Sequence, residues 1–236
     1  MHQPAPAPLV VFDLDGTLVD TAPDLIDTLN GLLVREGITA VPFDEARRFI
    51  GGGARLLIER GLAAQGRDCG SAAIDRLYAV YVDAYAERIA DLSRPFPGVI
   101  DALDALDGAG CRFAVCTNKL ERLSRKLLDA LGLAGRFRAI CGQDTFAVMK
   151  PDPQALLGTI AAAGGDPART VMVGDSGTDI LTARASGVPV VAVDFGYTEV
   201  PIASLGPDRV IGHYAELPDA VAALLDTTAG TPTYSG

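Results

Sequence analysis

Two aspartates stand one residue apart, directly after a short apolar run near the start of the chain. The run Leu9–Phe12 is followed by Asp13, Asp15, Gly16 and Thr17. Such a run predicts a buried strand, and carboxylates at alternate positions after it can face one ligand at the strand's carboxyl end. An Asp-Gly pair is also common in ordinary surface turns, so this segment alone leaves both interpretations open.

Further polar clusters occur in order along the chain, each at the end of a predicted strand or just before a predicted helix. Their side chains are Thr117, Asn118, Lys150, Asp175 and Asp179. Because ligands bind at the carboxyl edge of open parallel sheets, we expect these clusters to meet the first aspartates there. A carboxylate that attacks a phosphate dianion is repelled by it, so a cation has to screen both charges, and aspartate oxygens suit Mg²⁺.

The order and types of these residues resemble the motifs of the haloacid dehalogenase superfamily over residues 8–226. Within it, the chain is most similar to the bacterial phosphoglycolate phosphatases, through the segments Phe12–Asp20, Ile50–Gly53, Thr117–Lys119 and Lys150–Pro151. The resemblance implies a magnesium-dependent phosphomonoester hydrolase that acts through an aspartyl-phosphate. Its implied reaction converts 2-phosphoglycolate to glycolate and phosphate.

The resemblance also implies roles for individual residues. Asp13 attacks phosphorus, and Asp15 protonates the leaving oxygen and then activates the hydrolytic water. Mg²⁺ is held by the side chains of Asp13 and Asp175 and by the backbone carbonyl of Asp15. Asp179 supports the site by orienting the phosphate-binding lysine or a metal-bound water. The residues expected to bind the phosphoryl group are Gly16, Thr117, Asn118 and Lys150.

Other functions of the superfamily have to be compared with hydrolysis. Haloacid dehalogenases lack the second aspartate, so Asp15 disfavours dehalogenation. Sugar phosphomutases of the β-phosphoglucomutase type keep both aspartates and remain an alternative, as does a phosphatase for another small phosphomonoester. Thr17 favours hydrolysis, because those mutases usually carry valine there. A phosphate-binding regulatory domain without turnover is disfavoured, since all expected catalytic positions are present.

The elements that must position these residues alternate between strands and helices. Helical patterns separate the apolar runs, for example over Leu120–Leu131 and Ile180–Ala185, and Asp152-Pro153 and Asp166-Pro167 predict helix starts. Further strands are predicted at Arg112–Cys116, Arg138–Cys141, Thr170–Val173, Val188–Val193 and Arg209–Ile211. This alternation predicts an α/β fold with a doubly wound, Rossmann-like parallel sheet covered by helices on both faces.

The alternation stops between Asp20 and Phe96. Apolar residues over Ile74–Leu92 repeat at helical spacing, and further helical patterns precede them at Leu25–Val34 and Leu56–Leu62. We therefore expect a discontinuous core domain, residues 1–20 and 96–236, with an inserted helical cap domain at residues 21–95.

A glycine-rich turn lies inside this predicted cap. Because helix N-termini and guanidinium groups favour anions, we hypothesise that Gly52, Gly53 and Arg55 recognise the substrate. A flexible turn and an exposed arginine are the alternatives. Lys119 is a weaker candidate for binding the phosphoryl oxygens and is interpreted instead as a solvated neighbour of the site. Three tyrosines, Tyr78, Tyr81 and Tyr85, are expected to pack the cap interior without a chemical role.

The composition excludes several classes of function. A formal net charge of −10 disfavours binding to nucleic acid or to a membrane surface, which both require clustered Lys and Arg. Two histidines are too few for a zinc cluster, and the four cysteines form no C-x-x-C pair. We expect a cytoplasmic enzyme, monomeric or homodimeric, whose partner is a small phosphorylated metabolite.

Overall fold

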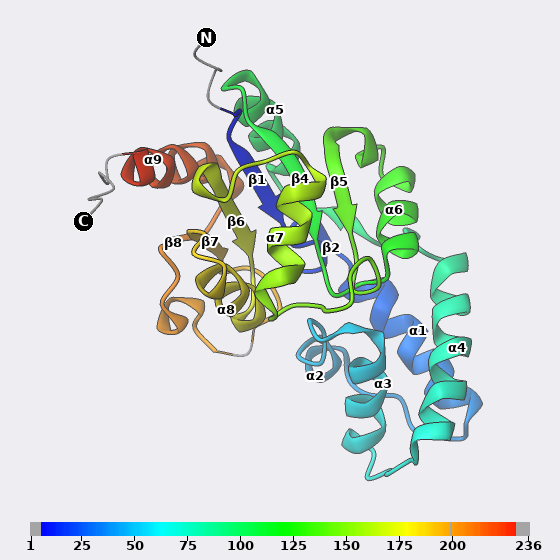
Figure 1. The fold of residues 1–236 in the computed structure, drawn as a ribbon. Coiled ribbons are helices and arrows are strands. Elements are labelled where there is room, and N and C mark those ends of the chain that lie inside the picture. Colours follow the sequence, from blue (N-terminus) through cyan, green and yellow to red (C-terminus); the bar gives the residue numbers. More distant parts are fainter. Residues whose placement is uncertain (1–5, 199, 230–236) are drawn as a thin grey trace.

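A parallel sheet forms the centre of the computed structural model, which describes residues 6–198 and 200–229. Within these residues the sheet has six strands in the order β5-β4-β1-β6-β7-β8, and every neighbouring pair is parallel. The strands are β1 (Leu9–Phe12), β4 (Arg112–Cys116), β5 (Phe137–Cys141), β6 (Thr170–Gly174), β7 (Val190–Val193) and β8 (Arg209–Ile211). This topology confirms the predicted doubly wound α/β fold (Figure 1).

Helices cover both faces of the sheet. One face carries α7 (Pro153–Ala162) and α8 (Gly177–Ala185), which pack on Leu9 and Val11 of β1. The other face carries α5 (Val99–Gly108), α6 (Glu121–Ala130) and α9 (Leu217–Ala229), which share a core with Val10 and Phe12. Both faces of β1 are therefore buried, which explains why its sequence is apolar throughout instead of alternating.

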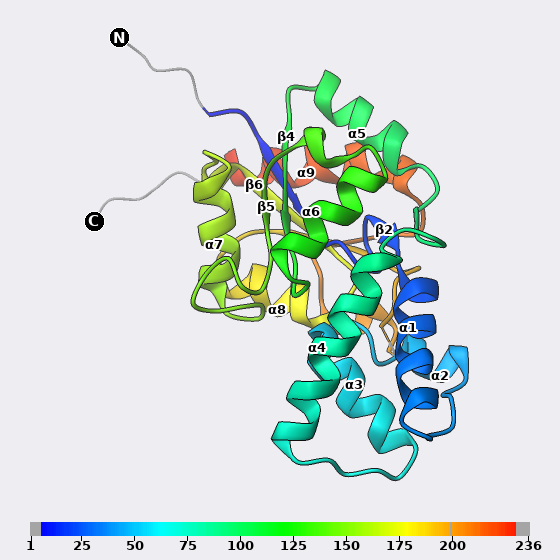
Figure 2. The same cartoon turned by 90° about the vertical axis from the view of Figure 1, so that its right-hand side faces the viewer.

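A helical insert leaves the sheet after β1 and returns before α5. It contains α1 (Ala22–Arg35), α2 (Phe43–Arg47), α3 (Gly53–Ala64) and α4 (Ser71–Glu87), which project away from the sheet in both views (Figures 1 and 2). A short antiparallel ribbon of β2 (Val19–Asp20) and β3 (Arg94–Pro95) closes its base. The chain that returns from the insert to the core is thus paired as a strand at Arg94 and Pro95.

The remaining elements are short 3₁₀ helices: η1 (Ala134–Arg136), η2 (Pro167–Arg169), η3 (Ile202–Leu205) and η4 (Tyr214–Glu216). Asp152 caps α7 by accepting the Gln154 N–H at 2.8 Å, as its Asp-Pro pair predicted. The second Asp-Pro pair begins only η2, because the chain enters β6 directly afterwards. No helix among the described residues is long and apolar enough to cross a membrane.

Candidate active site

The loops that follow β1, β4 and β6 meet at one edge of the sheet. Phe12, the last residue of β1, pairs with Val115 on one side and Val173 on the other, so the residues after these strands lie together. Lys150 reaches the same place from the segment before α7. Its Nζ lies 3.0 Å from Asp13 Oδ1 and 2.6 Å from Asp179 Oδ1. The predicted motif residues therefore form one buried cluster.

Gly16 allows the first loop to fold tightly over this cluster. Its N–H donates to the Val19 carbonyl at 3.0 Å, and the Val19 N–H donates to the Leu14 carbonyl at 3.0 Å. Gly16 has a φ of +85°, and a Cβ there would lie 2.5 Å from Asp175 Oδ2. Any other residue would be strained and would displace that carboxylate. The contact seen for Gly16 is thus with Asp175, whereas the sequence assigned it to the phosphoryl group.

Two residues without an assigned role in the sequence fix the Asp175 carboxylate. Thr17 Oγ1 donates to Asp175 Oδ1 at 3.1 Å, and the Tyr197 N–H donates to Asp175 Oδ2 at 2.7 Å. Thr17 directly follows the Asp-Gly pair and could have been found from that position. Tyr197 lies in the loop after β7, and no local pattern marks it.

Burial changes the protonation behaviour of the acidic residues. It raises the pKa of Asp13 from 3.8 to about 6, with Lys150 opposing the rise and Asp179 adding to it. Burial likewise raises the pKa of Asp175 from 3.8 to about 8, and the charges of Asp179 and Asp13 add to the shift. The site thus concentrates more negative charge than its own lysine neutralises.

Lys150 is held as a cation in spite of its burial. Desolvation alone would lower its pKa, but the charges of Asp13 and Asp179 outweigh desolvation and raise the pKa above its ordinary value. Asp179 is fixed in turn by Ser176, whose N–H and Oγ donate to Asp179 Oδ2 at 3.1 and 2.6 Å at the start of α8. Asp179 is thus fixed in contact with Lys150, and its role in orienting that lysine or a metal-bound water stays a prediction.

The donor atoms of the cluster fit a hard divalent cation. One carboxylate oxygen from each of Asp13, Asp175 and Asp179 lies within 4.8 Å of the others. Asp13 Oδ1 makes its ion pair with Lys150, but it accepts no hydrogen bond from the described residues. Buried carboxylates with raised pKa values are stabilised in their ionised form when a cation binds, and oxygen ligands of this kind suit Mg²⁺.

Thr117 and Asn118 extend the site from the end of β4. Asn118 Nδ2 donates to the Lys150 carbonyl at 3.1 Å, and this hydrogen bond joins the end of β4 to the segment before α7. Asn118 Oδ1 is buried and has no partner among the described residues. Thr117 Oγ1 accepts the Lys119 N–H at 3.2 Å. Both side chains line a cavity above the acidic cluster.

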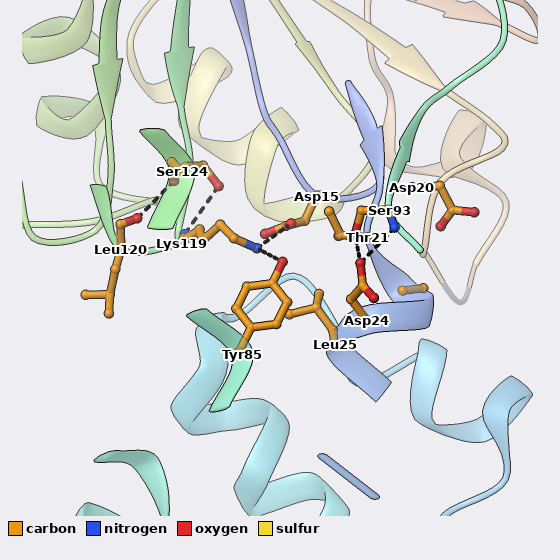
Figure 3. A network of polar contacts seen from close by, with 12 residues as sticks. Asp15, Asp20, Thr21, Asp24, Leu25, Tyr85, Ser93, Lys119, Leu120 and Ser124 are labelled. Carbon is orange, nitrogen blue, oxygen red and sulfur yellow. Dashed lines mark hydrogen bonds and ion pairs between the residues drawn. The ribbon is translucent and has the colours of Figure 1, made fainter. Parts of the chain in front are cut away.

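Lys119 is part of this cavity, so its interpretation as a solvated neighbour is wrong. Only 6% of its side chain is exposed, and its Nζ donates to Asp15 Oδ1 at 2.8 Å and to the Tyr85 hydroxyl at 2.9 Å (Figure 3). Tyr81 and Tyr85 do pack inside the insert, as expected, but the hydroxyl of Tyr85 also reaches the site. The sequence does not predict this contact, because Lys119 lies in the loop after β4 whereas Tyr85 lies on α4 of the insert.

The cavity lies between the sheet edge and the helical insert and has a volume of about 50 Å³. That volume holds only a few water molecules. Its core side is formed by the loops after β1 and β4, together with Gln143. Its insert side is formed by Leu25, Ile50, Gly51, Gly53, Ala54, Leu57, Tyr81 and Tyr85. An entering ligand would therefore meet an apolar wall opposite a charged floor.

The structure separates the three residues hypothesised to recognise the substrate. Gly53 lines the cavity with a φ of +85°, and a Cβ there would lie 3.2 Å from the Asn118 carbonyl, so glycine permits close contact with the core. Gly52 is not among the lining residues. Arg55 is 46% exposed and pairs with Asp75 and Glu59 outside the cavity. The arrangement thus matches the alternative of an exposed arginine.

Comparison with protein families relates this site to a known group. Residues 10–193 match the family model described as haloacid dehalogenase-like hydrolase. This range contains every motif residue placed at the sheet edge and the whole insert.

Individual relatives are similar over nearly the full chain. The phosphoglycolate phosphatase of Mesorhizobium japonicum is 52% identical over 223 residues, which cover 94% of this chain and 98% of the relative. The N-acetylmuramic acid 6-phosphate phosphatase of Pseudomonas aeruginosa is 36% identical, covering 90% and 93%. A crystal structure of a "predicted phosphoglycolate phosphatase" from Haemophilus somnus has a TM-score of 0.84 at 29% identity, covering 91% and 97%.

Proposed function

The chain belongs to the haloacid dehalogenase-like hydrolase family and is a phosphomonoester hydrolase, and from this premise we propose that its substrate is 2-phosphoglycolate. The 52% identity to a phosphoglycolate phosphatase over almost the whole chain carries this proposal. The cavity supports it, because Asp13, Asp15, Thr117 and Asn118 all line it and can meet one small phosphomonoester together.

In the proposed mechanism, Asp13 is the nucleophile. Its carboxylate oxygen attacks phosphorus, the ester P–O bond breaks, and an aspartyl-phosphate forms. The ion pair with Lys150 holds Asp13 in place, and the same ammonium neutralises charge on the phosphoryl oxygens as the transition state forms. Asn118 and Thr117, which line the cavity, are placed to bind the remaining phosphoryl oxygens.

Asp15 is the proposed proton carrier. It faces the cavity, on the side from which the leaving group departs, and gives its proton to the leaving oxygen. It then takes a proton from water, which attacks phosphorus, releases phosphate and regenerates Asp13. Asp15 thus ends the cycle protonated, as it began.

Mg²⁺ is the proposed cofactor, held by the carboxylates of Asp13 and Asp175 and by the backbone carbonyl of Asp15. When bound, it supplies the positive charge that allows a carboxylate and a phosphate dianion to approach. Thr17 and Tyr197 keep Asp175 oriented toward this position through their hydrogen bonds. Gly16 leaves the space that the carboxylate needs.

We further propose that residues 21–95 act as a cap and that residues 1–20 and 96–236 form the catalytic core. The insert supplies the apolar wall of the cavity, and the ribbon of β2 and β3 lies where the chain passes between the insert and the core. Closing such a cap excludes water from the aspartyl-phosphate until the leaving group has departed.

A substrate screen tests this function. Purified protein with Mg²⁺ is assayed for phosphate release from 2-phosphoglycolate, sugar phosphates, N-acetylmuramic acid 6-phosphate, phosphoserine, nucleotides and pyrophosphate. We expect the highest kcat/KM for 2-phosphoglycolate. A higher value for the muramic acid ester would instead favour the activity named for the Pseudomonas aeruginosa relative. Conversion of β-glucose 1-phosphate to the 6-phosphate would favour a mutase.

A further inference from the structure

Lys119 is the one cation that lines the cavity in the described part of the chain. Lys150 lies deeper, between two carboxylates, and Arg55 lies outside. The remaining charged lining residues are Asp13 and Asp15. A substrate with a second anionic group, besides its phosphate, therefore has one side chain in the cavity that can neutralise that group.

The ammonium group of Lys119 has unused hydrogen-bonding capacity. Among the described residues its Nζ donates to Asp15 Oδ1 and to the Tyr85 hydroxyl, whereas an ammonium carries three N–H donors. The Tyr85 hydroxyl accepts from Lys119 and, in the described residues, donates to no acceptor. One N–H and one O–H thus remain for a ligand at the same point of the cavity (Figure 3).

The backbone of Lys119 is held firmly, so its position is defined before a ligand binds. Its carbonyl accepts the Gln143 N–H at 3.0 Å, and its N–H donates to Thr117 Oγ1. A Cβ on Gly142 would lie 2.5 Å from the Lys119 carbonyl, so this loop and the one after β5 are in close contact. The side chain also packs over the Tyr85 ring, with Nζ 4.5 Å from the ring centroid.

The ion pair with Asp15 fixes where a second anionic group would lie. Asp15 has to reach the oxygen that leaves phosphorus, and Lys119 is hydrogen-bonded to Asp15 on the side of the insert. In 2-phosphoglycolate the carboxylate is one methylene group away from that oxygen. The carboxylate would then lie next to the Lys119 ammonium, and without that ammonium it would lie unpaired against the apolar wall of the cavity.

We propose that Lys119 and Tyr85 bind the carboxylate of the substrate and thereby select small phosphomonoesters that carry a carboxylate beside the leaving oxygen. This inference rests on the proposed function and names the residues that determine its specificity. Lys119 thus takes the role in substrate recognition that was hypothesised for Arg55, which lies in an exposed ion pair. It also gives the buried lysine a function beyond its contact with Asp15.

The test compares two substrates of equal shape. Phosphoglycolamide replaces the carboxylate of 2-phosphoglycolate by an uncharged amide, and kcat/KM is measured for both with the wild-type protein and with Lys119→Met. The wild type should prefer the acid by on the order of a hundredfold, since a charge-assisted contact is lost with the amide. In Lys119→Met the ratio of kcat/KM for the acid to that for the amide should fall to within a few fold of one. Tyr85→Phe should reduce this ratio less than Lys119→Met does.

Lys126→Met is the matched control, because it removes the same charge from an exposed position on α6 outside the cavity lining and should keep the wild-type preference. Its Nζ donates to the Ala86 carbonyl, so this control also tests the loss of a lysine contact with α4. Lys119→Gln repeats the test with a polar side chain, so a folding defect in one variant leaves the measurement intact. If kcat/KM of the Lys119 variants fell by the same factor for both substrates, the preference for the acid would be retained. That result would overturn the assignment and leave Lys119 as a positioning residue for Asp15. If the wild type itself shows no preference for the acid, the proposed substrate is wrong instead.

Discussion

Asp13 and Asp15 are neighbours in sequence but meet different partners. Both line the cavity, but Asp13 pairs with Lys150 at the centre of the acidic cluster, whereas Asp15 pairs with Lys119 on the side of the insert. A group fixed beside the phosphoryl site suits nucleophilic attack, and a group facing the departing alcohol suits proton transfer. The different roles proposed for these two identical side chains thus follow from their different surroundings.

Substitution of each aspartate should separate these roles. Asp13→Asn should remove turnover of every monoester. Asp15→Asn should still allow Asp13 to be phosphorylated by para-nitrophenyl phosphate, because nitrophenolate leaves without a proton. A burst of nitrophenolate, equal to the enzyme concentration and followed by slow turnover, would show this. Near-normal turnover by Asp13→Asn, with deamidation ruled out by mass spectrometry, would exclude Asp13 as the nucleophile.

Gly16→Ala should damage the site through its backbone. The added Cβ would meet Asp175 Oδ2 at 2.5 Å at a position with φ of +85°. We expect a loss of about 1–3 kcal/mol in the free energy of unfolding, measured in urea, together with weaker activation by Mg²⁺. Gly108→Ala is the control, since nothing lies within 4 Å of its Cβ and alanine favours the helix. Equal stability of both variants would contradict the argument.

At the level of elements, Tyr197 connects the site to the base of the insert. Its N–H binds Asp175, while its hydroxyl accepts the N–H groups of Thr21 and Ala22 at 2.7 and 2.9 Å and donates to Asp20 Oδ1 at 2.7 Å. The first turn of α1 would otherwise leave these two N–H groups without acceptors. A single loop residue therefore both supports the Asp175 carboxylate and caps the start of a helix.

Tyr197→Phe should expose that dependence. Loss of the hydroxyl leaves two buried N–H groups unpaired, so we expect the free energy of unfolding to fall by about 1–3 kcal/mol. The backbone contact to Asp175 is retained, so activation by Mg²⁺ should change less than stability does. Tyr78→Phe is the matched control, because its hydroxyl has only a 3.5 Å contact with Gln143. Equal urea midpoints for wild type and Tyr197→Phe would disprove the capping role.

The sequence predicts the elements best where a short stretch determines them. Runs of three or four buried apolar residues followed by a polar cluster predicted β1, β4 and β6, and therefore the sheet edge at which the motif residues meet. The short strands β2 and β3 have two residues each, too few for any pattern. The burial of Lys119 depends on Tyr85, which comes from the distant helix α4. Local patterns cannot report such contacts, and Lys119 was consequently misread.

For the whole molecule, the acidic cluster links stability to pH and metal. Without a cation, Asp13 and Asp175 have pKa values of about 6 and 8, compared with 3.8 when unfolded. Between about pH 4 and pH 8 the folded protein therefore holds protons that the unfolded chain has lost, so its stability falls as the pH rises. Because the proposed Mg²⁺ would bind the ionised carboxylates, its addition should restore more stability at high pH.

This linkage can be measured by thermal unfolding. The Tm of metal-free protein should fall from pH 5 to pH 8, and saturating Mg²⁺ should raise the Tm more at pH 8 than at pH 5. Asp175→Asn should show a flatter pH dependence and a smaller response to Mg²⁺. If Mg²⁺ raised the Tm equally at both pH values, metal binding would not be coupled to the loss of protons from these carboxylates.

The ribbon of β2 and β3 has a consequence for how the chain folds. The central strand β1 lies near the start of the sequence, but its partner strands lie far along the chain. Leu9 pairs with Arg112 and with Thr170. Pairing β1 with β4 requires closure of a long loop, which is entropically slow. The helices α1 to α4 contact one another locally, and their assembly brings Asp20 beside Arg94, which shortens that loop. We therefore expect the insert to nucleate folding, with its amides protected before those of β1 in pulsed hydrogen exchange; simultaneous protection would contradict this order.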